Sequence, residues 1–273
     1  MDIVIDTKDF KDLLESIRFI YGYDFTDYAE AAVKRRITHF MKSRTIETLD
    51  TLGKTLVKDE KFFEEFVQEM SVTVTEMFRD PSFYKALREK VMKRLATYPT
   101  LKIWIAGCAT GEEVYSMAIL LKEEGLLDRS IIYATDINQK SLQMAKQGVY
   151  SLEGMKMYTD NYYQAGGVSA FSDYYTTKGD AVVFEKTLVQ NVLFSPHNLA
   201  ADQSFNEFQL IICRNVLMYF NQTLQEKVVE LFYNSLCPFG FLGLGDKESL
   251  LFSTRKKCFD ETERKEKIYM KSR

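Results

Sequence analysis

Residues 101–116, LKIWIAGCATGEEVYS, decide the fold of this chain. The apolar run at residues 103–106 predicts a strand that is buried on both faces of a parallel sheet. Gly107 and Gly111 then let the backbone turn sharply and leave no side chain between the loop and a ligand. An apolar helix follows at once. Strand, glycine loop and helix in this order predict the first unit of a doubly wound α/β sheet that binds a nucleotide.

The loop lacks the signatures of phosphate-binding loops. It has neither G-x-G-x-x-G spacing nor Gly-Lys followed by Ser or Thr. Glu112 and Glu113 at the helix start would also repel a pyrophosphate. A ligand with a nucleoside and a positive charge but no phosphate fits better, and S-adenosylmethionine is such a ligand. The alternative is an ordinary strand-to-helix turn whose acidic residues favour the helix dipole.

Composition describes an ordinary globular protein of 273 residues, 46% apolar and 27% charged. The formal net charge of -3 argues against a general nucleic-acid binder. No signal peptide and no run long enough to cross a membrane is evident, so we expect a cytoplasmic protein without membrane insertion. Four scattered cysteines and two histidines predict reduced thiols and no metal site.

Helical periodicity extends from the amino terminus to about residue 97, and Tyr98-Pro99-Thr100 punctuates the chain there. We therefore expect an amino-terminal helical domain with a linker helix over residues 1–97. The sheet domain then covers residues 98–273, and residues 151–190, rich in tyrosine, are expected to form an inserted subdomain. Pro81 is expected to begin the linker helix.

One amphipathic helix, over residues 28–44, is distinctly basic. Its apolar face is Val33, Ile37, Phe40 and Met41, and its other positions include Lys34, Arg35, Arg36, His39, Lys42 and Arg44. A charged helix face is usually only solvated. The alternative is that this face binds an acidic partner.

Polar residues end two later strands. Asp136 ends the run SIIYATD, where a carboxylate can accept hydrogen bonds from ribose hydroxyls, although it could equally cap the helix at 139–147. Arg214 and Asn215 end the apolar run that begins at Phe208. In an open α/β sheet, ligands bind at the carboxyl ends of the strands, so these side chains should face the same crevice as Gly107.

Four motifs together resemble the CheR-type chemotaxis protein methyltransferases. In order they are T-x-x-F-R-D-P at 75–81, GCATGEEVYS at 107–116, ATDIN at 134–138 and CRNVLMYF at 213–220. The resemblance runs from about Phe10 to the end of the chain. It implies a Rossmann-like class I methyltransferase sheet with an amino-terminal all-helical domain and a small β insertion. It also implies the cofactor S-adenosylmethionine and methylation of chemoreceptor glutamates to γ-glutamyl methyl esters.

The resemblance also implies roles for individual residues. Tyr219 matches a tyrosine near the transferred methyl group, Arg79 matches a residue that helps to position the substrate, and we assign both to catalysis. The residues assigned to cofactor binding are Thr73, Thr75, Arg79, Gly107, Glu113, Asp136, Asn198, Leu199, Arg214 and Asn215. Thr73 departs from the family, since many members have asparagine there. Arg35, Arg36 and Lys42 are assigned to the acidic helical surface of a receptor.

Three other functions stay open. The chain could methylate carboxylates of a signalling protein that is not a classical chemoreceptor, because its insertion departs from members that hold a receptor peptide. It could be a catalytically silent scaffold that binds S-adenosylmethionine. It could also methylate small molecules or nucleic acid, which its acidic balance disfavours. The scarcity of histidine is no obstacle to carboxylate methylation, because a glutamate with a pKa of about 4.3 is already ionised at neutral pH.

Overall fold

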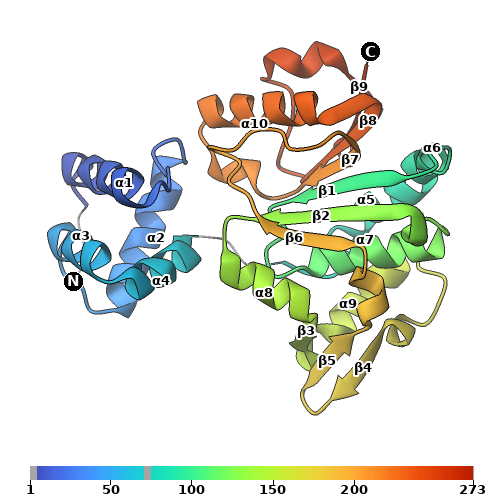
Figure 1. Cartoon of the computed structure of the whole chain (residues 1–273), viewed down its shortest axis with the longest axis horizontal. Helices are drawn as coiled ribbons and strands as arrows, with labels where there is room; N and C mark the ends of the chain where they lie inside the picture. The colour runs from blue at the N-terminus through green and yellow to red at the C-terminus, as the bar shows by residue number, and fades with distance from the viewer. Residues whose placement is uncertain (1–4, 71–74, 273) are drawn as a thin grey trace. The chain divides into compact units, whose positions relative to one another are not determined.

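The computed structural model describes residues 5–70 and 75–272, and these divide into two units (Figure 1). The first, called here the helical unit, comprises residues 5–70 together with Met218–Val228. The second, the sheet unit, comprises residues 75–217 and 229–272. The described helix that begins at Pro81 thus belongs to the sheet unit, so the division falls earlier in the chain than the expected boundary at residue 97.

The amino-terminal part of the helical unit consists of α1 (Thr7–Tyr21), α2 (Glu30–Ser43), α3 (Leu49–Lys58) and α4 (Glu60–Met70). The Asp6 carboxylate accepts hydrogen bonds from the first turn of α1, and Gly22 ends that helix with a φ of 74°. The apolar faces of these helices form one core, in which Ile37, Phe40 and Phe66 are fully buried. The expected apolar face of α2 is confirmed.

A distant segment of the chain completes the helical unit. The Ala29 amide donates to the Tyr219 carbonyl over 2.8 Å, and the Asn221 amide donates to the Asp27 carbonyl over 2.8 Å. Between these bonds, Tyr28 pairs with Phe220 in an antiparallel bridge, and their ring centroids lie 4.9 Å apart. Residues directly after the Arg214-Asn215 strand end are therefore held by the helical unit.

In the described residues, the sheet unit is built on a seven-stranded sheet in the order β6-β2-β1-β7-β8-β10-β9. Its strands are β1 (Leu101–Ala106), β2 (Ser130–Asp136), β6 (Val192–Pro196), β7 (Phe208–Cys213), β8 (Leu236–Leu244), β9 (Phe259–Glu263) and β10 (Ile268–Lys271). The first five in spatial order are parallel, and β10 is antiparallel to both β8 and β9. This doubly wound arrangement confirms the predicted fold class.

Side chains of β1 alternate between the two faces of the sheet, and both faces are covered. Ile103 and Ile105 belong to the core that includes α7 (Glu112–Glu123). Trp104 points to the other face, where its ring lies 5.4 Å from that of Phe232, in the second half of α10 (Gln222–Ser235). Helices on both faces explain why the strand is a continuous apolar run.

The remaining helical segments are short. A continuous helical stretch runs through α5 (Pro81–Ala86), the π-helical turn η1 (Leu87–Met92) and α6 (Lys93–Leu95), and Pro81 begins it as expected. The α8 helix (Gln139–Gln147) follows β2. The 3-10 turns are η2 (Leu127–Arg129), η3 (Leu152–Gly154), η4 (Phe171–Tyr174), η5 (Lys186–Val189), η6 (Leu217–Tyr219) and η7 (Thr254–Cys258).

The insertion contains a second, antiparallel sheet of β3 (Val149–Ser151), β5 (Ala181–Phe184) and β4 (Tyr175–Lys178). It also contains α9 (Met155–Gln164), which sequence periodicity did not predict because α9 buries only Met155 and Tyr162. The buried Glu123 carboxylate of α7 attaches this insertion by accepting hydrogen bonds from Tyr162, Tyr174 and the Val168 amide, and it pairs with Arg88. Within the described residues, no helix has the length and apolar character that a membrane span requires.

Candidate functional site

Four parallel strands end at one edge of the main sheet, called here the cofactor edge. Asp136 ends β2, Gly107 follows β1, Arg214 follows β7, and His197 follows β6. The His197 amide donates to the Asp136 carbonyl over 3.2 Å, which joins two of these ends directly. Asn198 and Leu199 come next, and the Asn198 side chain accepts from the Ala200 amide over 2.9 Å. The fold thus brings most of the expected cofactor-binding positions to one edge, as ligand sites in open α/β sheets require.

The glycine loop uses its backbone donors internally. The Gly107 and Cys108 amides both donate to the Thr135 carbonyl, over 2.8 and 2.9 Å, and the Gly111 amide donates to the Cys108 carbonyl over 3.0 Å. The Ala109 amide donates to Asp136 Oδ2 over 2.9 Å. These four donors do not form a cradle for phosphate, in contrast to phosphate-binding loops.

Asp136 therefore organises the loop as well as the strand end. Its Oδ2 accepts from Ala109, and its Oδ1 accepts from the Asn138 amide over 2.8 Å. Burial raises the pKa of this carboxyl group, although both amides act in the opposite direction. The alternative role as cap of α8 falls to Asn138, whose side chain accepts from the Ser141 amide. Asp136 is thus free of the capping role and lies at the cofactor edge.

Gly107 is constrained by a neighbouring side chain. It has a φ of +77°, and a Cβ built there would lie 2.5 Å from Val216 Cγ2. We expected a side chain at this position to occupy ligand space. The structure instead shows that the first obstacle is Val216, which lies just after β7.

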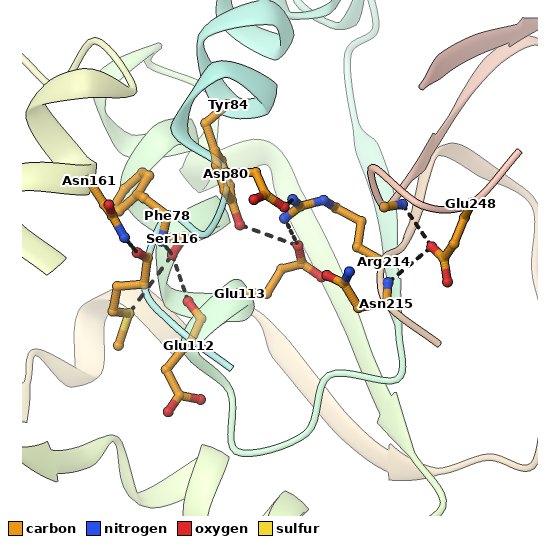
Figure 2. Close-up of polar contacts among 12 residues, drawn as sticks. Phe78, Asp80, Tyr84, Glu112, Glu113, Ser116, Asn161, Arg214, Asn215 and Glu248 are labelled. Atoms are coloured by element: carbon orange, nitrogen blue, oxygen red, sulfur yellow. Dashed lines mark hydrogen bonds and ion pairs between the residues drawn. The ribbon is translucent and has the colours of Figure 1, made fainter. Parts of the chain in front are cut away.

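Arg214 is buried and lies at the centre of a charge cluster (Figure 2). Its Nη1 donates to Glu113 Oε1 over 3.0 Å, and its Nη2 donates to Asp80 Oδ2 over 2.6 Å. The guanidinium lies 4.3 Å from the ring centroid of Phe83. Burial alone would lower the pKa of Arg214, but Glu113, Tyr84 and Asp80 hold the net pKa above its usual value. Arg214 Nε is buried and makes no hydrogen bond to any described residue.

Glu113 keeps part of its acceptor capacity. Both Arg214 and the Tyr84 hydroxyl donate to Oε1, the latter over 3.3 Å. Within residues 5–70 and 75–272, no hydrogen bond to Oε2 is formed. This oxygen, at the first turn of α7, is the one suited to accept a donor from a cationic ligand.

The segment that carries Arg79 is held from three sides (Figure 2). The Phe78 amide donates to Ser116 Oγ over 2.8 Å, and Asn161 Nδ2 donates to the Met77 carbonyl over 3.1 Å. Asp80 is paired with Arg214. Phe78 and Asp80 have φ values of 51° and 54°, a conformation that is costly without glycine and that clusters at functional sites. Arg79, half-buried between them, is therefore on a backbone whose position is fixed by α7, α9 and β7.

A second buried carboxylate supports the end of β7. Glu248 Oε2 accepts from the Asn215 amide over 3.0 Å and from the Gly245 amide over 2.7 Å (Figure 2). It thereby links the strand ends of β7 and β8 and supports Asn215, whose φ is 61°. The sequence analysis did not predict Glu248 as a site residue, because it lies in no recognisable motif. It also assigned a role to Arg79 and none to Asp80, although the place of Asp80 within the F-R-D-P motif could have indicated one.

Tyr219 belongs to the helical unit. The Arg36 guanidinium lies 5.0 Å from its ring centroid and donates to the Met70 carbonyl over 2.5 Å. Arg36 is half-buried by these contacts, whereas Arg35 and Lys42 are exposed on α2. Arg36 therefore contacts other residues of the helical unit, and its assignment to a receptor surface stays a prediction. Lys34 and Arg44 are engaged as well, with Glu30 and Glu65.

For two of the expected cofactor-binding residues, Thr73 and Thr75, the predicted role stays a prediction. Thr73 lies outside the described residues, and Thr75 is half-buried with no distinguishing contact. In the part of the chain that the structure describes, no group of three or more His, Cys, Asp or Glu side chains could hold a metal ion. Burial raises the pKa of Cys108 well above its usual value, so its thiol is not activated as a nucleophile.

The electrostatics of the cofactor edge suit a cationic nucleoside. Glu112, Glu113 and Asp136 supply carboxylates around a loop whose amides are already used. Burial raises the pKa of Glu112 to about 7, while the Thr110 hydroxyl donates to its Oε2 over 2.7 Å. A nearby cation would offset the cost of ionising this buried carboxyl group. The donor set therefore fits S-adenosylmethionine, with ribose hydroxyls toward Asp136 and an ammonium group toward Glu113.

Comparison with known proteins agrees with this arrangement. Residues 73–268 match the CheR methyltransferase, SAM binding domain, and residues 8–71 match the CheR methyltransferase, all-alpha domain. The chain belongs to the CheR methyltransferase family. Its cofactor is therefore S-adenosylmethionine. The all-alpha domain match falls in the helical unit, and the SAM binding domain match covers most of the sheet unit together with Met218–Val228.

Full-length relatives support the same assignment. The Cher3 protein of Pseudomonas putida is 48% identical over 95% of each chain. The chemotaxis protein methyltransferase of Listeria innocua is 30% identical over 89% of this chain and 91% of its own length. Chemotaxis protein methyltransferase 1 of Vibrio cholerae is 29% identical over 93% of this chain and 94% of its own length. The CheR-family chain described here is accordingly an S-adenosylmethionine-dependent methyltransferase.

Proposed function

We propose that this CheR-family protein methylates glutamate side chains in the cytoplasmic helical domain of chemoreceptors and so acts in chemotactic adaptation. The observation that carries the proposal is the position of Arg79. It lies on a rigidly held segment beside the Asp80–Arg214–Glu113 cluster at the cofactor edge. A cation there, next to a cofactor site, suits a carboxylate as the methyl acceptor.

The residues at the cofactor edge would have separate tasks in this reaction. When bound, S-adenosylmethionine supplies an electrophilic methyl group. Asp136 and Glu113 would hold it, the first through its ribose and the second through its ammonium group. Arg214 keeps the Glu113 carboxylate oriented, because its Nη1 donates to Glu113 Oε1.

Arg79 would orient the glutamate carboxylate of the substrate. No general base is needed, because that carboxylate is ionised at neutral pH. What the protein must supply is alignment, and alignment can account for roughly 7–11 kcal/mol of a reaction barrier. Tyr219 would limit the positions open to the carboxylate, and Arg36 of the helical unit holds its ring.

The names of the relatives support the pathway. Proteins from Listeria innocua and Vibrio cholerae that match nearly the whole chain are named chemotaxis protein methyltransferases. Exposed Arg35 and Lys42 on α2 would meet the acidic face of a receptor helix. The names of the relatives favour a chemoreceptor as the source of that acidic face.

Transfer of a labelled methyl group tests the proposal. The protein is incubated with labelled S-adenosylmethionine and purified chemoreceptor cytoplasmic fragments. We expect incorporation that is released as methanol in base, because carboxylate esters are base-labile. Arg79→Met should lower turnover much more than cofactor affinity, with Arg94→Met, an exposed arginine of the same unit, as control.

Other outcomes distinguish the alternatives. Base-labile incorporation into other signalling proteins, with none into receptors, would favour a non-classical carboxylate substrate. Tight cofactor binding without transfer to any protein would favour a silent scaffold. Base-stable incorporation would exclude carboxylate methylation altogether.

A further inference from the structure

A pocket of about 300 Å³ lies on the last two strands of the sheet unit, away from the residues assigned to the cofactor. Its lining includes the buried rings of Phe259 and Tyr269 and the exposed Leu251. Three cations also line it, Lys256, Arg264 and Lys267, against the single carboxylate of Glu261. Arg264 lies 3.7 Å from that carboxylate, which leaves the two lysines without an anionic partner among the described residues.

Sheet topology places one end of this pocket at the cofactor edge. Gly243 near the end of β8 is opposite Ile268 at the start of β10, and the Leu244 amide donates to the Lys267 carbonyl over 3.1 Å. The turn that carries Arg264 and Lys267 therefore lies at the same edge as Asn215. Strand β10 is two positions from β7 in the sheet, so about 10 Å separates their ends.

The segment that forms the other wall is anchored at the active site. It leaves β8 at Gly245, where Glu248 links it to the Asn215 amide. A few residues later it presents Leu251 and Phe252, which are 55% and 79% exposed. Two adjacent exposed apolar side chains beside cations give this segment the apolar and charged character that a contact surface needs.

We propose that this surface, formed by Leu251, Phe252, Lys256 and Lys267, binds an acidic amphipathic segment of the protein that is methylated. The inference rests on the proposed function and identifies a docking element on the sheet unit itself. Charge complementarity selects the occupant, since the substrate carries several carboxylates besides the one that reacts. Two turns of a substrate helix span about 11 Å, which matches the separation between the end of β7 and the pocket.

Two variants of the full-length protein test the surface. Lys256→Glu with Lys267→Glu reverses its charge, and Leu251→Ser with Phe252→Ser removes its apolar tip. We expect each to raise the KM for a chemoreceptor cytoplasmic fragment by about 3- to 30-fold, with S-adenosylmethionine affinity within twofold of wild type. The effect of the charge reversal should shrink as salt is added, because exposed charges are screened.

Matched controls lie elsewhere on the same unit. Lys90→Glu with Lys93→Glu reverses two exposed lysines on the helical stretch that precedes β1, and Val168→Ser removes an apolar side chain that is 80% exposed in the insertion. Both controls should keep the wild-type KM. If the serine variant fails to fold, the charge-reversed variant carries the test alone.

Several results would overturn the proposal. One is an unchanged KM in the charge-reversed variant while wild-type protein methylates the fragment. Another is loss of binding to vesicles of anionic phospholipid with methylation unaffected, which would make the surface a membrane contact. If wild-type protein methylates no receptor fragment, the proposed function fails first, and the docking surface fails with it.

Discussion

At the scale of single residues, two carboxylates at the cofactor edge accept hydrogen bonds from the backbone. Asp136 accepts from an amide in the glycine loop and from another at the start of α8. Glu248 performs the same task for Asn215 and Gly245. These residues set the shape of the site, and substitutions there should change cofactor affinity before they change turnover.

Asp136→Asn provides the residue-scale test. The amide side chain can keep one backbone hydrogen bond but presents an N–H group to the second donor, and it loses the charge that would hold ribose hydroxyls. Hydrogen bonds to charged groups contribute about 1.5–3 kcal/mol, so the dissociation constant for S-adenosylmethionine should rise about 10- to 100-fold. Calorimetric titration measures this directly. Asp128→Asn, at an exposed position, is the control, and an unchanged affinity in folded Asp136→Asn would refute the role.

At the scale of secondary structure elements, the glycine loop depends on the segment after β7. Gly107→Ala would place a Cβ 2.5 Å from Val216 Cγ2. We expect this variant to lose cofactor affinity because the loop must shift, and Val216→Ala in the same chain should restore most of it by removing that atom. The positive φ of Gly107 would remain, so rescue should be incomplete. Equal affinities of Gly107→Ala with and without Val216→Ala would contradict the steric explanation.

Helix α2 has two basic sides with different roles. Arg36 is engaged with Tyr219 and the Met70 carbonyl, whereas Arg35 and Lys42 are exposed. Arg35→Glu with Lys42→Glu should raise the KM for a receptor fragment about 2- to 30-fold at low salt, and the effect should fade with added salt. Arg36→Met should instead lower turnover, because it releases the Tyr219 ring.

Steady-state kinetics at two salt concentrations separate these effects. Cofactor affinity should be unchanged in the double variant, and Lys11→Glu with Lys61→Glu, at exposed positions of α1 and α4, serves as the control. Wild-type kinetics in the α2 double variant at low salt would show that this helix face is only solvated.

At the scale of the whole molecule, Glu112 couples stability to pH. Its folded-state pKa is about 7, above the ordinary value of 4.5, because burial disfavours its charged form. The folded state therefore binds more protons than the unfolded state between these values, and stability falls as pH rises through this window. The difference corresponds to a loss of about 3 kcal/mol above pH 7.

Glu112→Gln should remove that pH dependence. The variant should match wild type near pH 4.5 and exceed it by up to about 3 kcal/mol at pH 8, since a neutral amide carries no such penalty. Denaturant unfolding at several pH values measures the difference, and Glu153→Gln, an exposed glutamate, serves as the control. If wild type and Glu112→Gln lose stability in parallel as pH rises, Glu112 is not the group that causes the pH dependence.

Much of this architecture could be predicted from the sequence because its signals are local. The apolar run of β1, the glycine loop and the apolar start of α7 are contiguous, and their backbone preferences act over a few residues. Gly22 and Pro81 mark helix ends for the same reason. Helix α9 escaped prediction because only two of its residues are buried, which leaves little periodic signal.

By itself, the sequence determined the order of elements, the doubly wound sheet and the chemical character of the cofactor edge. Only the tertiary structure decided which charges meet there. Arg214 pairs with Glu113 from 101 positions away and with Asp80 from 134. Likewise, Arg36 is half-buried because its guanidinium packs on the ring of Tyr219, a residue far away in the sequence. Tertiary packing brings distant segments together and removes their charged groups from water. A charge that is buried in this way is stable only when it is paired, and its partner can come from any part of the chain that packs against it.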